Sequence, residues 1–156
     1  MNKIVPNLWF DTEAEEAANH YTSIFKDSEI VNVTHYGEAG PREAGLVMTV
    51  TFRIQGQEFT GINGGPEFKF DEAISFLVNC ESQEEVDYYW DRLGEGGEEG
   101  VCGWLKDRFG VSWQIVPTAF EEMIQDEDSE KVNRAMSAML QMKKLDIATL
   151  KKAFDG

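Results

Sequence analysis

Apolar and polar positions pass through the same succession of periods twice along this chain of 156 residues. Residues 4–10 and 74–80 alternate as β-strands do, and each run is followed by apolar residues at helical spacing. Further apolar runs separated by turn residues follow each predicted helix. We therefore expect two copies of one unit, each made of a strand, a helix and then further strands.

Both predicted helices begin with the spacing of a capping box, Thr12-x-x-Glu15 in the first copy and Ser82-x-x-Glu85 in the second. In a capping box the hydroxyl accepts a hydrogen bond from the third helical amide, and the Glu carboxylate accepts one from the amide of the cap residue. The second helix should end near Gly94, because glycine commonly follows the last helical turn.

The later strands of each copy are bounded by turn residues. We expect them at residues 29–36, 46–54 and 58–63 in the first copy, and at 103–106 and 111–116 in the second. The segment 37–45 between the first two of these strands is rich in turn residues, so we expect a mobile loop there. Paired copies of such a unit usually face their sheets toward a shared concavity, which favours a pocket.

The strands that precede the helices separate two faces. One face of each is apolar and suited to packing under a helix: Ile4, Leu8 and Phe10 in the first copy, and Ile74, Phe76, Val78 and Cys80 in the second. The opposite faces are mixed: Val5, Asn7 and Trp9, and then Ser75, Leu77 and Asn79. A face that carries Asn, Ser and Trp within an apolar strand is typical of a binding wall.

Beyond Pro117 the pattern becomes helical, with Val132, Met136, Met139 and Leu140 at helical spacing. Asp146 is placed to cap a last helix. We expect a single domain over 1–156, with a first module at 3–65, a second at 66–117 and a C-terminal helical extension at 118–156.

The net charge of −15 limits the function classes. Residues 129–156 carry six Lys or Arg against three Asp or Glu, so the acidic excess lies in the residues before them. An acidic body repels phosphate backbones and anionic lipid, so we expect no nucleic-acid and no membrane partner. The N-terminus shows no signal-peptide core, which predicts a cytoplasmic protein. In that compartment Cys80 and Cys102 should be two thiols.

The doubled strand-helix-strand-strand-strand unit resembles the vicinal oxygen chelate superfamily, which includes glyoxalase and bleomycin-resistance proteins. Within it the chain is similar to the PhnB-like, demethylubiquinone methyltransferase-like group. The resemblance covers about residues 3–117 and rests on these motifs: Pro6-Asn7-Leu8-Trp9-Phe10, Tyr36-Gly37-Glu38, Ile62-Asn63-Gly64-Gly65-Pro66, Ala73-Ile74-Ser75-Phe76, Asp87-x-x-Trp90 and the run Cys102 to Gln114. It implies an α+β fold of two tandem βαβββ modules that form a cupped mixed sheet, with C-terminal helices, and a homodimer.

In metal-using members the resemblance implies ligands on the first strand of each module and on the final strand. Those positions correspond to Val5, Ala73 and Gln114. Val and Ala offer no lone pair, and one neutral amide oxygen is too little for a first-row divalent ion. We therefore expect no metal and no other cofactor.

The principal functional hypothesis is a metal-free cup that binds a small polar organic ligand of unknown identity. Its ligand-binding residues would be Asn7, Trp9, Ser75, Asn79, Trp104 and Gln114, with His35 beside them at the edge of the 37–45 loop. Trp supplies a broad apolar wall, while amides and hydroxyls fix the orientation of a ligand.

Two alternatives remain open from the sequence. The first is a superfamily enzyme, an isomerase, a lyase or a transferase-like protein, whose acid-base group would be Glu58, Glu67 or His35. The second is a non-catalytic dimer that acts through its surface. Methyl transfer is not favoured, because both strands enter their helices without the glycine-rich turn over which a nucleotide-like methyl donor commonly sits.

Overall fold

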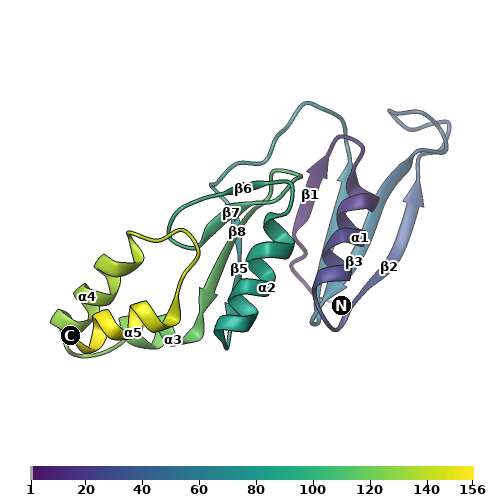
Figure 1. Cartoon of the computed structure of the whole chain (residues 1–156). Helices are drawn as coiled ribbons and strands as arrows, with labels where there is room; N and C mark the ends of the chain where they lie inside the picture. The colour runs from purple at the N-terminus through teal and green to yellow at the C-terminus, as the bar shows by residue number, and fades with distance from the viewer. Residues whose placement is uncertain (1) are drawn as a thin grey trace. The chain divides into compact units, whose positions relative to one another are not determined.

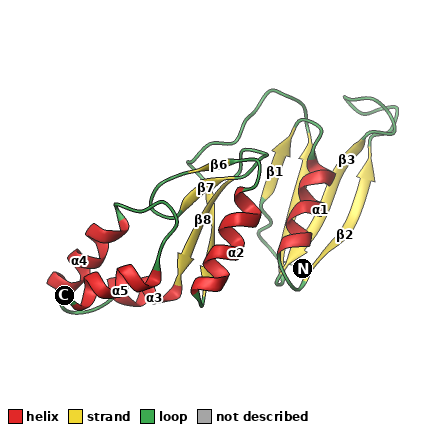
Figure 2. Cartoon of the chain, in the orientation of Figure 1, coloured by secondary structure: helices red, strands yellow, loops and turns green. Residues whose placement is uncertain are grey.

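The computed structural model describes residues 2–156, and the chain forms two compact units that divide after Phe70. Each unit contains a four-stranded mixed sheet with a helix on one face (Figures 1 and 2). The α+β fold class and the tandem βαβββ modules are thus confirmed. None of the helices within residues 2–156 is both long and apolar enough to cross a membrane.

The first unit carries its strands in the order β1-β4-β3-β2, with β1 parallel to β4 and the other neighbours antiparallel. Its elements are β1 (Asn7–Phe10), α1 (Ala14–Ile24), β2 (Ser28–His35), β3 (Val47–Ile54) and β4 (Gln57–Asn63). α1 covers one face of this sheet (Figure 1). Ala14, Ala17 and Ala18 are fully buried, and the short alanine side chains let the helix approach the sheet closely.

The beginning of α1 differs from the expected capping box. The helix starts at Ala14, and its N-cap residue Glu13 makes no capping bond. Instead the Ala14 amide donates to Oδ1 of Asn63, at the end of β4, over 2.9 Å. A side chain from a distant strand therefore satisfies the helix terminus, and Thr12 is not the cap.

The second unit carries its strands in the order β5-β8-β7-β6, with β5 parallel to β8 and the other neighbours antiparallel. Its sheet and first helix consist of β5 (Ser75–Cys80), α2 (Gln83–Gly94), β6 (Glu98–Glu99), β7 (Trp104–Lys106) and β8 (Ser112–Pro117). The predicted end of the helix at Gly94 is confirmed. The short strand β6 has no counterpart in the sequence prediction.

Ser82 is the N-cap of α2, as predicted, since its Oγ accepts a hydrogen bond of 3.2 Å from the Glu85 amide. Replacing Ser82 with alanine should lower the free energy of unfolding by about 1 kcal/mol, because this amide then loses its acceptor. Urea denaturation measures the change. Ser137→Ala, at an exposed helical position, is the control and should stay within about 0.5 kcal/mol of the unchanged protein. Equal effects of the two substitutions would contradict the assignment of the cap.

The C-terminal helices are α3 (Thr118–Ile124), α4 (Ser129–Met139) and α5 (Ile147–Asp155). They share one apolar cluster with the end of β8, made of Val116, Phe120, Met123, Ala135, Leu145 and Leu150. Asp146 caps α5 as predicted, accepting from the Thr149 amide over 2.8 Å. The expected methionine stripe only flanks this cluster, and Leu140 is exposed.

Gln83, the first residue of α2, joins the C-terminal segment to the second unit. Its Nε2 donates to the Leu145 carbonyl oxygen over 3.1 Å, and its Oε1 accepts from the Ile147 amide over 2.8 Å. The backbone amides of Cys102 and Gly103 also donate to carbonyl groups of the 142–143 segment. The C-terminal helices are therefore built into the second unit.

Two residues expected in the core are exposed. Ile4 is 84% exposed and Ile74 is 74% exposed. The strands begin at Asn7 and at Ser75, so both isoleucines lie before the first paired residue. The other inward positions of the first strand, Leu8 and Phe10, are buried as predicted.

Candidate functional site

The face of the first sheet that lies opposite α1 is rich in polar side chains. Alternation along paired strands places these residues on it: Asn7 and Trp9 of β1, Glu58, Thr60 and Ile62 of β4, Thr49 and Thr51 of β3, and Asn32 and Thr34 of β2. We call this set the first polar face. The hydroxyl oxygens of Thr34 and Thr49 lie 2.6 Å apart, so the two side chains are hydrogen-bonded across the strands.

Trp9 has a defined position on the first polar face. Its Nε1 donates to the Gly65 carbonyl oxygen over 2.9 Å, and its ring meets the Phe68 ring edge to face at 5.0 Å. A Cβ at Gly64 would lie 2.3 Å from the indole, so only glycine lets the backbone pass this close. Asn7 is exposed, and its amide donates to the Val5 carbonyl oxygen over 2.9 Å.

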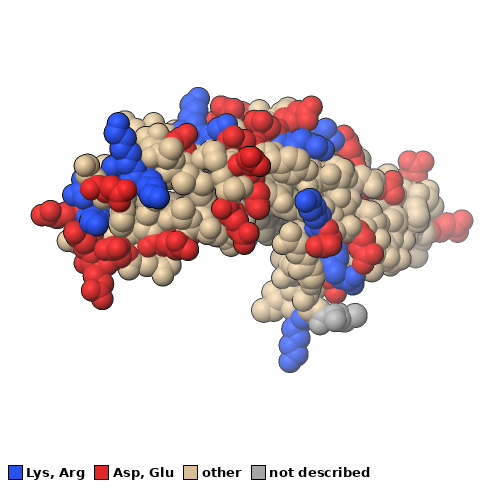
Figure 3. Space-filling model, turned by 60° about the horizontal axis from the view of Figure 1, so that its bottom comes forward, with Lys and Arg blue, Asp and Glu red and all other residues tan. Residues whose placement is uncertain are grey.

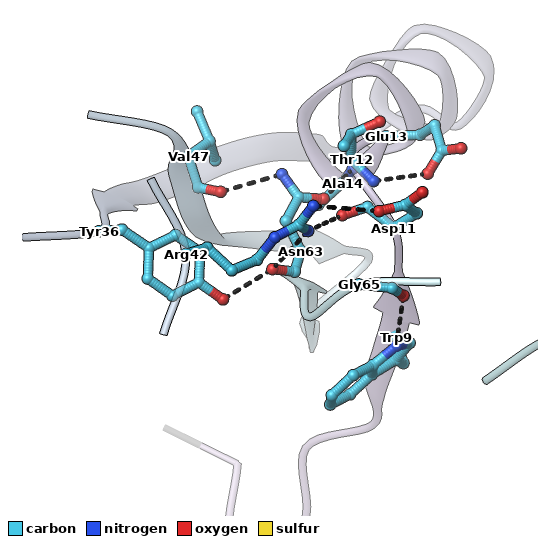
Figure 4. Close-up of polar contacts among 10 residues, drawn as sticks. All are labelled: Trp9, Asp11, Thr12, Glu13, Ala14, Tyr36, Arg42, Val47, Asn63 and Gly65. Atoms are coloured by element: carbon cyan, nitrogen blue, oxygen red, sulfur yellow. Dashed lines mark hydrogen bonds and ion pairs between the residues drawn. The ribbon is translucent and has the colours of Figure 1, made fainter. Parts of the chain in front are cut away.

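Asn63 is the centre of a buried hydrogen-bond network at the end of β4 (Figure 4). The residue is 1% exposed. Besides capping α1 through Oδ1, it donates from Nδ2 to the Val47 carbonyl oxygen over 3.0 Å. Its own carbonyl oxygen accepts a bond of 2.7 Å from the Tyr36 hydroxyl and one of 3.3 Å from Arg42. This network joins β4, β3, α1 and the 37–45 loop.

Arg42 holds the 37–45 loop, which the sequence pattern predicted to be mobile. Its guanidinium donates to the carbonyl oxygen of Asp11 and lies 3.2 Å from the Asp11 carboxylate (Figure 4). His35, at the start of this loop, is exposed on β2. β1 and β2 are opposite edges of the sheet, roughly 14 Å apart, so His35 does not lie beside Asn7 and Trp9.

In the second unit, three of the residues singled out from the sequence lie together. The Gln114 Nε2 on β8 donates to the Ser75 Oγ on β5 over 2.9 Å. Trp104 lies on β7, the other neighbour of β8, and is the cross-strand partner of Gln114. Lys106 and Ser112 lie on the same face. They are paired with each other, and each is two positions along its strand from Trp104 or Gln114. We call Ser75, Trp104, Lys106, Ser112 and Gln114 the second polar face. Asn79 is exposed on the same side of β5, beyond Leu77.

A partly open cavity of about 200 Å³ adjoins the second polar face. Trp104, Lys106 and Ser112 line it together with Glu72, Glu98 and Glu99. Of these six residues, sequence reasoning had selected only Trp104. The available signal was the Asp107-Arg-Phe-Gly110 turn, which sets the register that brings Lys106 opposite Ser112.

The groups considered for acid-base chemistry are placed differently from one another. Glu58 is half-buried on the first polar face, whereas Glu67 is exposed outside the strands.

Burial, together with the nearby Glu85 carboxylate, raises the pKa of the Cys80 thiol to about 12, so Cys80 stays protonated and is a poor nucleophile at neutral pH. Hydrogen bonding to Glu72 raises the pKa of Lys106, which therefore remains a cation.

Acidic side chains are spread over the face of the molecule shown in Figure 3, with Lys and Arg side chains between them. This distribution agrees with the net charge of −15. A negative surface of this kind raises the local concentration of small cations and lowers that of anions.

The tandem modules define a vicinal oxygen chelate-like fold. A structure of the fosfomycin resistance protein FosX from Listeria monocytogenes superposes on this chain with a TM-score of 0.55 at 16% identity. The superposition covers 80% of this chain and 98% of that one. A Pseudomonas aeruginosa protein superposes with a TM-score of 0.62 at 21% identity, over 75% of this chain and 98% of that one.

A family model described as 3-demethylubiquinone-9 3-methyltransferase matches residues 2–116, and the chain belongs to this family. A structure from Bacillus cereus, described as a putative 3-demethylubiquinone-9 3-methyltransferase and PhnB protein, is 40% identical with a TM-score of 0.68. The similarity covers 74% of this chain and 99% of that one. No curated protein matches the sequence. The predicted PhnB-like membership is confirmed.

One structure of Listeria FosX is a complex with Mn(II) and sulfate, so the fit of a metal to this chain can be tested on its donor atoms. At the positions that the family resemblance suggested for metal ligands, Val5 and Ala73 carry no donor, and Gln114 is bonded through Nε2 to Ser75. Within residues 2–156 no three His, Cys, Asp or Glu side chains are grouped so that they could hold a metal ion. This donor set does not fit a first-row divalent ion.

Proposed function

We propose that this chain binds a small polar organic ligand through its polar sheet faces, with no metal ion taking part. The observation that carries the proposal is the Ser75–Gln114 pair beside Trp104. With Nε2 committed to Ser75, Gln114 offers its amide oxygen to a ligand, and Ser75 offers its hydroxyl proton. An aromatic wall beside a few oriented polar groups is the usual composition of a small-molecule site.

The description of the family names methyl transfer, which we do not include in the proposal. One amide in the first turn of each helix is bonded to a side chain: that of Ala14 in α1 to Asn63, and that of Glu85 in α2 to Ser82. Neither strand-to-helix turn contains glycine, so neither offers the open backbone over which a nucleotide-like methyl donor commonly sits. The acid-base alternative rests on Glu58, a half-buried carboxylate on the first polar face.

We also propose a homodimer, which light scattering of the intact chain tests. Deleting residues 129–156 is not a suitable test, because Leu145 and Leu150 are buried in the cluster that covers the end of β8. A truncated chain would therefore lose part of its core as well as any contact with a second copy.

The ligand-binding proposal is tested by titrating the protein with a panel of cationic, neutral and anionic small molecules. Nuclear magnetic resonance follows the Trp104 indole proton and the Gln114 side-chain amide. We expect at least one class to shift both signals and Gln114→Leu to weaken that binding about tenfold, because the amide oxygen is lost. Gln141→Leu, at an exposed position, is the control and should bind normally. If no class shifts either signal, the proposal is wrong.

A further inference from the structure

Ser112, a residue that lines the cavity beside the second polar face, carries a buried hydroxyl that the protein does not satisfy. Ser112 is 1% exposed, and its Oγ has no hydrogen-bond partner among residues 2–156. A buried polar atom without a partner destabilises the folded state, because it has lost its hydrogen bonds to water. Because Ser112 lines the cavity, a ligand in the cavity is a suitable partner for this hydroxyl.

The charged groups of the cavity are mostly acidic. Three glutamates, Glu72, Glu98 and Glu99, line the cavity together with one lysine, Lys106. The Lys106 Nζ lies 2.5 Å from Glu72, so these two charges neutralise each other and the Glu98 charge remains. Glu99 accepts a hydrogen bond of 3.2 Å from the Trp90 indole of α2, so its carboxylate lies on the α2 side of the sheet. Glu98 lies opposite Lys106, on the second polar face. The remaining negative charge favours a cationic ligand.

Trp104 adds an aromatic surface to the same cavity. The face of an indole ring attracts cations within about 6 Å, and its area also binds apolar groups. A carboxylate beside a tryptophan is therefore suited to an ammonium group carried on a small apolar body. The cavity volume of about 200 Å³ admits a molecule of roughly ten non-hydrogen atoms.

The position of Glu98 depends on close backbone packing at the edge of the sheet. β6 pairs with β7 so that Glu98 lies opposite Lys106. A Cβ at Gly97 would lie 2.0 Å from the Lys106 carbonyl oxygen, and a Cβ at Gly100 would lie 2.8 Å from that of Trp104. The glycines on both sides of β6 thus let the strand approach β7 closely enough for Glu98 to lie beside the cavity.

We propose that this cavity binds a small protonated amine, whose ammonium group meets Ser112 Oγ and the Glu98 carboxylate while its apolar body lies against Trp104. The inference rests on the proposed function, because Trp104 belongs to both. It adds the chemical class of the ligand and assigns direct contacts to two residues, Glu98 and Ser112, that the test of the ligand-binding proposal does not use.

The test uses three probes of similar shape and different charge: benzylammonium, benzyl alcohol and benzoate. We expect benzylammonium to shift the Trp104 indole proton and the amides of Glu98 and Ser112, with a Kd about tenfold or more below that of benzyl alcohol. Benzoate should shift none of them. Equal binding of benzyl alcohol or benzoate, or no shift with millimolar benzylammonium, overturns the inference.

Two failures are distinguishable in the same titrations. If a neutral or anionic molecule shifts Trp104 and Gln114 while benzylammonium does not, ligand binding stands and only the amine class is wrong. If neither these probes nor the wider panel shift any signal, both proposals are wrong.

Variants separate a binding role from a structural one. Glu98→Gln should weaken benzylammonium binding about tenfold, whereas Glu84→Gln, at an exposed position of α2, should leave it unchanged. Ser112→Ala should also weaken binding but keep or raise the Tm, because it removes an unsatisfied buried hydroxyl. A lowered Tm with unchanged affinity would assign Ser112 to the fold and overturn its place in the site.

Discussion

Replacing Asn63 with alanine should lower the free energy of unfolding of the first unit by about 3 kcal/mol. The substitution removes the acceptor of the Ala14 amide and the donor to the Val47 carbonyl oxygen, and both backbone groups then lack a partner inside the protein. Urea denaturation gives the change in free energy. Hydrogen exchange should show the loss of protection concentrated in the first turn of α1.

Asn32→Ala is the matched control for Asn63. Asn32 is exposed on β2, so its replacement should change the stability by less than about 0.5 kcal/mol. If Asn63→Ala costs no more than the control, the network at the end of β4 does not stabilise the fold. Uniform loss of protection across the unit, with none specific to α1, would contradict its role as the helix cap.

Replacing Asp107 with alanine should cost about 4 kcal/mol, the largest effect that we expect from a single polar residue. Asp107 is 3% exposed and follows β7 directly. Its Oδ1 accepts from the amides of Phe109 and Val111 over 2.9 and 3.0 Å, and its Oδ2 accepts from the Trp113 indole over 2.9 Å. Alanine leaves these buried donors without their acceptors, and the β7–β8 turn loses its support.

Asp107→Asn provides an internal comparison, because one amide oxygen can still accept the turn amides while the amide nitrogen cannot accept from Trp113. Its cost should therefore lie between that of alanine and zero. Asp91→Ala, on the exposed side of α2, is the control and should be nearly neutral. Thermal unfolding followed by tryptophan fluorescence measures the three variants, and equal losses for Asn and Ala would show that the turn amides contribute nothing.

Local patterns predicted those parts of the fold whose partners are close in sequence. The Ser82 cap, the Gly94 end of α2 and the Asp146 cap all depend on residues within one helix, and all three are present. The start of α1 was mispredicted because its acceptor, Asn63, belongs to a strand 49 positions further along the chain. Such a bond cannot be inferred from spacing, since it depends on the parallel pairing of β1 and β4.

The exposed residues Ile4 and Ile74 and the short strand β6 show a second limit of prediction from sequence patterns. Alternation continues to Ile4 and Ile74, but the pairing with neighbouring strands begins only at Asn7 and Ser75. β6 consists of two glutamates, so no apolar alternation marks it. It is a strand only because Gly97 allows close packing on β7.

The sequence pattern identified residue types that suit a site, but it did not show which of these residues lie next to one another. Ser75, Trp104 and Gln114 were selected as polar or aromatic residues in apolar strands, and the register of β5, β8 and β7 brings them together. Asn7 and His35 came from the same reasoning, yet the strand order β1-β4-β3-β2 separates them. The cavity residues Glu72 and Glu98 lie on a connection and on the unpredicted strand, where sequence patterns carry little information about contacts.

The bonds from Gln83 to the segment 145–147 have a consequence for the order in which the protein matures on the ribosome. The sheet and helix of the first unit lie within the first 70 residues, so this unit can fold while the remainder is still being translated. The second unit needs Leu145 and Leu150 to cover the end of β8. Its folding must therefore wait until the chain has been translated past Leu150 and this segment has left the exit tunnel.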